Sequence, residues 1–308
     1  MAVDISHPRL PPRLRPGDTI GIAAPASHFK QEAFERGLQK LQSMGFKTHI
    51  PEGLFEKKDY LAGGDEHRAG LLNRLFGDRN INGIMCARGG YGSLRILNYL
   101  DFKGIRQNPK AFVGFSDITA ILSVLVTHCR MIAFHGPTLV GLGQSPLPTQ
   151  KALQNVLQAE TGLTIKSPAG VTLREGSAEA SILGGNLTTL CHLAGTPFMP
   201  QLKGCILLLE DNGEALYRID RMLHQMKLAG CLDGIVGVIL GRFENCGAIE
   251  DIYKVVLEVF DADDIPILAG LEVGHGHAQT NLTLPLGMPA TLDTSCRQVS
   301  FHIPTKDR

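Results

Sequence analysis

Residues 111–128 read AFVGFSDITAILSVLVTH, and this stretch decides the fold class. Its first four residues, Ala111–Gly114, have the pattern of a short buried strand, and a helix is expected from about Ser116 to His128. The same alternation extends outward on both sides, with strands expected at 20–24, 46–50, 83–87 and 131–134 and helices at 34–44, 67–76 and 93–100. This rhythm predicts an α/β fold with a parallel sheet covered by helices on both faces.

The chain changes character between residues 143 and 179, where Ser, Pro and Gly are frequent. This composition favours a linker with some short structure. A second α/β unit follows, with strands expected at 205–209 and 235–240, helices at 216–228 and 252–260, and short strands at 282–284, 290–292 and 299–303. We therefore expect an N-terminal α/β domain at 1–145, a linker at 146–178 and a C-terminal domain at 179–308, in keeping with a chain of 308 residues.

Composition and charge exclude several classes of protein. Lys and Arg number 30 and so do Asp and Glu, which argues against a nucleic-acid or membrane-surface partner. No secretory signal and no run of 18 apolar residues occurs, so a cytoplasmic protein is expected. The seven cysteines contain no C-x-x-C pair, which disfavours a zinc ribbon. No dinucleotide fingerprint or P-loop is found, and no cofactor is expected.

Ser116 is the first candidate for chemistry. It lies where a predicted parallel strand turns into a helix, at the sheet edge where such folds bind ligands. The free N–H groups and partial positive charge of a helix start favour an anionic intermediate. A plain helix N-cap is the alternative. Because residue 118 is Ile, the segment departs from the G-x-S-x-G nucleophile elbow.

Two more segments follow predicted strands. In Arg88-Gly89-Gly90-Tyr91-Gly92-Ser93, paired glycines let backbone N–H groups approach an anion, although a tight turn explains them equally well. Glu210 directly follows the apolar strand 205–209 and could orient an imidazole. A solvated turn is the alternative there.

Two histidines, His275 and His277, share the Gly-rich segment GHGHAQTNLTLPLG at 274–287. A metal site would need a third ligand, which the neighbouring sequence does not supply. A general base or an unremarkable surface loop are the other interpretations.

Taken together, these segments resemble the LD-carboxypeptidase family of serine peptidases. The resemblance covers residues 14–292, nearly the whole chain, and its landmarks are LRPGD at 14–18, IAAPAS at 22–27, ARGGYGS at 87–93, GFSDIT at 114–119, FHGP at 134–137, LGGNL at 183–187, LED at 209–211 and GHAQTNLTLPLG at 276–287. It implies an N-terminal flavodoxin-like or Rossmann-like domain, a smaller C-terminal β/α domain and a site between them.

The resemblance also implies roles for individual residues. Ser116 resembles the nucleophile, Glu210 the orienting carboxylate and His277 the base. His277 follows a glycine and precedes Asn281 by four residues, as in the family, and His275 is an extra imidazole. The N–H groups of Gly90 and Asp117 resemble the oxyanion donors, and no metal is implied. Three further substrate-binding candidates are Arg88, Tyr91 and Arg218, the two arginines as partners for a substrate carboxylate.

The implied activity is a cytoplasmic L,D-carboxypeptidase that trims terminal D-alanine from muramoyl tetrapeptides in peptidoglycan recycling, acting as a homodimer. A related alternative is the microcin C immunity branch, whose substrates are aminoacyl adenylate analogues. The absence of Trp and the compact chain favour the cell-wall substrate. A non-catalytic binder of small anions is a third possibility, and a nicotinamide-dependent dehydrogenase is disfavoured by the missing glycine fingerprint.

Overall fold

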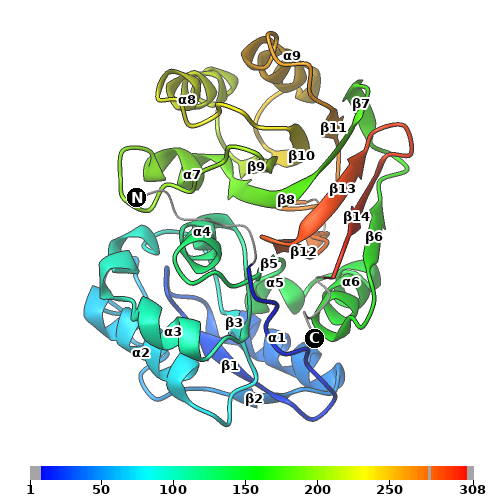
Figure 1. The fold of residues 1–308 in the computed structure, drawn as a ribbon. Helices are drawn as coiled ribbons and strands as arrows, with labels where there is room; N and C mark the ends of the chain where they lie inside the picture. Colours follow the sequence, from blue (N-terminus) through cyan, green and yellow to red (C-terminus); the bar gives the residue numbers. More distant parts are fainter. Residues whose placement is uncertain (1–7, 277–278, 304–308) are drawn as a thin grey trace.

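The computed structural model describes residues 8–276 and 279–303. The first half of the chain forms β1 (Thr19–Ala23), α1 (Gln31–Ser43), β2 (Lys47–His49), α2 (Asp65–Gly77), β3 (Gly83–Cys86), the 3-10 helix η1 (Leu94–Tyr99), α3 (Phe102–Gln107), β4 (Ala111–Gly114), the 3-10 helix η2 (Ser116–Ile118), α4 (Thr119–Thr127), β5 (Ala133–His135) and α5 (Leu139–Leu142). Figure 1 shows these elements in the lower part of the molecule.

The second half begins within the predicted linker. It forms α6 (Leu147–Gln158), β6 (Leu163–Lys166), β7 (Val171–Arg174), β8 (Ser177–Asn186), α7 (Leu187–Leu193), β9 (Ile206–Asn212), α8 (Leu216–Leu228), β10 (Gly237–Glu244), α9 (Ile249–Val259), β11 (Ile267–Ala269), β12 (Leu284–Leu286), β13 (Pro289–Asp293) and β14 (Gln298–Phe301). Residues 146–178 thus contain α6, β6, β7 and the first two residues of β8, and all three strands join one sheet.

Five strands of the first sheet are parallel, in the order β5-β4-β3-β1-β2. This is the flavodoxin-like order, and it confirms the predicted fold class. The strands β3 and β4 are buried along their whole length, as expected for strands covered by helices on both faces. In such a sheet ligands bind beyond the carboxyl ends of the strands. Residues 87–93 and Ser116 follow two of those ends.

The edge of this sheet comes from the far end of the chain. Strand β12 pairs antiparallel with β5, so that Leu284 lies opposite His135 and Leu286 opposite Ala133. A predicted strand near 282–284 is therefore present, but it completes the sheet of the first half. The two halves share a sheet as well as a contact surface.

The second sheet has eight strands in the order β6-β14-β13-β8-β9-β10-β11-β7. Its central strands β8, β9, β10 and β11 are parallel, and the others are antiparallel to their neighbours. Helix α4 of the first half contacts both α7 and β8, so it lies between the two units (Figure 1). In the part of the chain that the structure describes, no helix has the length and apolar character needed to cross a bilayer.

Candidate active site

Ser116 lies at the sharp turn between β4 and α4. Its φ of 66° is in the left-handed region, which is uncommon for a residue with a Cβ and typically strained. The preceding Phe115 is fully extended, with a φ of −157°. The chain therefore reverses abruptly at Ser116 without the second glycine of the usual elbow. A plain helix N-cap has an extended backbone, so the left-handed φ of Ser116 argues against that alternative.

The segment 88–93 passes directly beside the serine. A Cβ built on Gly89 would lie 2.9 Å from Cβ of Ser116, which shows how closely the backbone approaches the hydroxyl. Gly90 has a φ of 98°, and a Cβ there would lie 2.6 Å from Oγ of Ser27. The close approach at residue 89 and the left-handed φ at residue 90 both require glycine.

Two side chains hold this segment in place. Oγ of Ser27 accepts a hydrogen bond from the Tyr91 N–H at 3.1 Å. On the other side, Oδ2 of Asp117 accepts one from the Ser93 N–H at 2.8 Å. Burial raises the pKa of Asp117, although its bonds to Ser93 act in the opposite direction. Sequence reasoning missed Ser27, although IAAPAS was among the landmarks.

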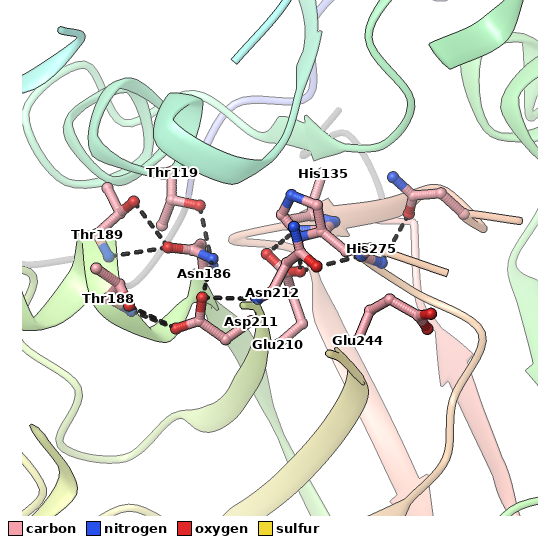
Figure 2. Close-up of polar contacts among 12 residues, drawn as sticks. Thr119, His135, Asn186, Thr188, Thr189, Glu210, Asp211, Asn212, Glu244 and His275 are labelled. Carbon is pink, nitrogen blue, oxygen red and sulfur yellow. Dashed lines mark hydrogen bonds and ion pairs between the residues drawn. The ribbon is translucent and has the colours of Figure 1, made fainter. Parts of the chain in front are cut away.

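Glu210 is fully buried near the end of β9, and an imidazole stands next to it. Nδ1 of His275 lies 2.6 Å from Oε2 of Glu210, and the backbone N–H of His275 donates to the same oxygen at 3.1 Å. Figure 2 shows this pair with His135 close by. A Cβ on Gly274 would lie within 2.4 Å of Oε2, so the turn before His275 also requires glycine.

Glu210 and His275 each stabilise the charged form of the other. Burial alone would raise the pKa of Glu210. The imidazoles of His275 and His135 outweigh this effect and hold that pKa at about 2. Burial would likewise lower the pKa of His275, but Glu210 outweighs it and the pKa is raised above 6.5. Glu210 is therefore an anion throughout the neutral range.

A cavity of about 850 Å³ is lined by Ser116, by residues of the segment 88–93 and by His275, whereas the buried Glu210 is not part of its wall. Its walls come from both halves of the chain: Arg88, Gly89, Gly90, Tyr91, Leu94, Phe115, Ser116, Asp117 and Thr138 from the first, and Asn186, Thr188, Thr189, His192, Asp211, Asn212, Glu214 and His275 from the second. Ser116, Gly90, Asp117, Arg88 and Tyr91 thus meet at one site. Arg218 is not part of the cavity wall. Its Nη1 lies 3.4 Å from Oε2 of Glu214, a residue that does line the cavity.

His277, the base that the resemblance implied, lies outside the described residues. The extra imidazole, His275, is the one beside Glu210. Within 8–276 and 279–303, no group of three or more His, Cys, Asp or Glu side chains could hold a metal ion.

A polar network supports the second wall of the cavity. Asn186 caps α7, because its Oδ1 accepts from Thr189 N–H, and its Nδ2 donates to Oδ1 of Asp211. The N–H of Asn186 donates to Oγ1 of Thr119 at 3.1 Å, which links the second unit to α4 of the first (Figure 2). Sequence reasoning noted the LGGNL motif without finding this role for it.

Comparison with known proteins identifies the family of the chain. Residues 20–136 match the family model described as LD-carboxypeptidase N-terminal domain, and residues 179–292 match that described as LD-carboxypeptidase C-terminal domain. A Bacillus subtilis protein named as a probable murein peptide carboxypeptidase is 34% identical, over 92% of each chain. The murein tetrapeptide carboxypeptidase of Pseudomonas aeruginosa is 32% identical, over 89% of this chain and 92% of its own.

A second kind of relative is equally similar. The microcin self-immunity protein MccF of Escherichia coli is 32% identical, over 96% of each chain. A solved structure of MccF with aspartyl sulfamoyl adenosine has a TM-score of 0.89 and 30% identity, over 96% of this chain and 99% of the other. The crystal structure of muramoyltetrapeptide carboxypeptidase from Oxalobacter formigenes has a TM-score of 0.81 and 27% identity, over 93% and 100%.

Proposed function

Since the chain belongs to the LD-carboxypeptidase family and is a serine carboxypeptidase, we propose that it removes the terminal D-alanine from muramoyl tetrapeptides. The observation that carries the proposal is the single cavity in which a strained serine, a glycine-rich backbone segment and a carboxylate-bound imidazole meet. A cell-wall peptide is the substrate class named for two of its relatives.

In the proposed mechanism, Ser116 attacks the carbonyl carbon of the L,D-peptide bond while an imidazole takes its proton. Glu210 orients that imidazole and stabilises its cationic form. The N–H groups of Gly90 and Asp117 receive the oxyanion of the tetrahedral intermediate. The imidazole then protonates the departing D-alanine, and water releases the acyl group from Ser116.

We propose His275 as the base, because its Nδ1 bonds Glu210 and the residue lines the same cavity as Ser116. The family spacing instead favours His277, so the two imidazoles must be tested separately. His275→Gln and His277→Gln are the matched variants. We expect the first to lose turnover by about 10⁴-fold, as other enzymes do when a triad member is disabled, and the second to retain it. The reverse result would assign the base to His277.

Recognition of the substrate's terminal carboxylate is assigned to Arg88. Arg88 is exposed and lines the cavity. Its guanidinium donates to the carbonyl of His28 at 2.8 Å, which holds the side chain near Gly89 and Gly90. Arg218, in contrast, is paired with Glu214. Arg88→Ala should raise KM for the tetrapeptide more than it lowers kcat, whereas Arg218→Ala serves as the comparison.

The experiment that tests the function uses L-Ala-γ-D-Glu-meso-diaminopimelate-D-Ala. Free D-alanine is followed by mass spectrometry for the wild type and for Ser116→Ala. Release by the wild type alone supports both the reaction and the nucleophile, and equal release by both proteins contradicts the assignment of Ser116. The cytoplasmic location and homodimeric state belong to the proposal through the family resemblance, and cell fractionation and light scattering test them.

The similarity to MccF, whose solved structure holds aspartyl sulfamoyl adenosine, favours a second candidate function. In that case the same serine would cleave an aminoacyl adenylate analogue. Hydrolysis of aminoacyl sulfamoyl adenosines, measured beside the tetrapeptide, separates the two. A higher kcat/KM for the nucleoside substrate would overturn the cell-wall proposal.

A further inference from the structure

The carboxylate of Glu210 has two oxygens in very different surroundings. Oε2 receives the two bonds from His275, at 2.6 and 3.1 Å. Oε1 is buried and has no hydrogen-bond partner among the described residues. A buried charged oxygen without a donor is costly, so a donor for Oε1 is expected nearby.

His135 is a candidate for this donor. Its Nε2 lies 3.9 Å from Oε1, the side chain is 0% exposed, and neither ring nitrogen has a hydrogen-bond partner in the described part of the chain. The distance is longer than a hydrogen bond but within reach after a small rotation of either side chain. Figure 2 labels both His135 and His275 next to Glu210.

The position of His135 in the first sheet shows why its contact with Glu210 matters. His135 is the last residue of β5, opposite Gly114 of β4, two residues before Ser116. On its other side it is opposite Leu284 of β12, the strand that follows the histidine segment. The ring of Phe115 contacts both imidazoles, with its centroid 5.9 Å from His135 and 4.8 Å from His275. Glu210, by contrast, belongs to the other sheet.

We propose that His135 is a positioning residue that donates from Nε2 to Oε1 of Glu210 and so holds this carboxylate in a fixed position relative to β4, the strand that precedes Ser116. It acts on catalysis through Glu210, which must not rotate while the neighbouring imidazole gains and loses its proton. The inference rests on the proposed serine mechanism, but it does not depend on which substrate is cleaved.

The charged surroundings determine the expected pH effect. Glu210 is faced by His275 and His135, with Asp211 next to it in the chain, and His275 is faced by Glu210 and Asp211. A carboxylate that is no longer held bonds the base less well. The pH at which kcat/KM falls on the acid side should then move to lower pH, because the base loses part of the stabilisation of its cation.

The test compares His135→Leu, which removes the donor, with His135→Gln, whose amide can reach the position of Nε2. We expect His135→Leu to lower kcat by about 10–100-fold, the loss seen when a supporting partner of a metal ligand is removed, with KM within about twofold. His135→Gln should restore most of the rate and the wild-type pH profile. His128→Leu and His128→Gln are the controls, since this half-buried imidazole lies at the end of α4, outside the cavity wall.

A second measurement is independent of the substrate. The rate of covalent labelling of Ser116 by a fluorophosphonate should fall in parallel with kcat. Unchanged kcat and labelling in folded His135→Leu would overturn the inference. If that variant does not fold, His135→Asn replaces it, because its amide is too short to reach Oε1; equal rates for the Asn and Gln variants would also overturn it.

The same measurements separate the inference from the proposed function. Labelling that depends on His135 without release of D-alanine would support the inference and contradict the proposed substrate. A wild type that neither labels nor hydrolyses any substrate would contradict both.

Discussion

At the scale of single residues, the site depends on close approaches that only glycine permits. Gly274 has a φ of 92°, and a Cβ there would lie within 2.4–2.7 Å of three Glu210 atoms. Gly195 has a similar φ of 82° but nothing within 4 Å of a built Cβ. Comparing the same substitution at the two positions therefore separates the effect of backbone strain from the effect of a clash with Glu210.

We predict that Gly274→Ala and Gly195→Ala both lose about 1–3 kcal/mol of unfolding free energy from the unfavourable φ. Gly274→Ala should in addition lower kcat by about 100-fold, because it displaces Glu210, the carboxylate that we propose orients the base. Denaturant titration and steady-state kinetics measure the two effects. Equal kcat values for the two variants would contradict the role given to the turn at Gly274.

The pair of His275 and Glu210 also predicts a pH dependence. A base must be neutral, and the pKa of His275 is raised above 6.5 since the charge of Glu210 outweighs burial. Activity should therefore be lost as pH falls through a value above 6.5. In Glu210→Gln the rate should fall and the midpoint of that loss should move to lower pH, as shown by a profile of kcat/KM. A midpoint that does not move would exclude His275 as the base.

At the scale of elements, the carboxylate of Asp117 joins η2, which leads into α4, to the segment 88–93. Its Oδ2 accepts from the N–H of Ser93, and the hydroxyl of Ser93 donates back to the Asp117 carbonyl. These contacts fix the backbone that carries Gly90. Asp101 plays a comparable structural part elsewhere, since it caps α3 by accepting from Gly104 N–H at 2.9 Å.

We predict that Asp117→Ala costs about 1–3 kcal/mol of stability, because a buried N–H loses its acceptor. It should also lower kcat by displacing Gly90. Asp101→Ala should cost about 1 kcal/mol, as the loss of a cap does, and leave kcat unchanged. Thermal unfolding and tetrapeptide turnover are the measurements. The proposed link between loop and helix fails if Asp117→Ala keeps the wild-type kcat.

At the scale of the whole molecule, strand β12 binds the two units into one. It follows the histidine segment in the chain, yet it forms the edge of the first sheet beside β5. The bond from the Asn186 N–H to Thr119 adds a second link between the units. A fragment of residues 1–145 would expose the β5 edge that β12 covers.

We predict that the full chain unfolds in one cooperative transition and that the 1–145 fragment is poorly soluble and lacks such a transition. An exposed strand edge promotes association, and the fragment also loses apolar contacts. Calorimetry of the chain and light scattering of the fragment check this. A monomeric fragment with its own sharp transition would show that the first unit folds alone.

The sequence by itself determined the local elements and the residue types of the site. The helix expected at 216–228 is α8 as observed, and Ser116, Gly90, Asp117, Arg88 and Tyr91 all line one cavity. Strand and helix patterns arise from neighbours in the chain, and the residues after strand ends meet because parallel strands share an edge.

Only the tertiary structure decided what depends on distant contacts. The expected helix at 93–100 is a 3-10 helix, and the expected linker holds α6, β6 and β7. Strand β12 joins the first sheet, and His275 pairs with a carboxylate 65 residues away. Local periodicity does not identify such partners. A strand has the same sequence pattern whichever sheet it joins, and each of the two histidines follows a glycine in the same way.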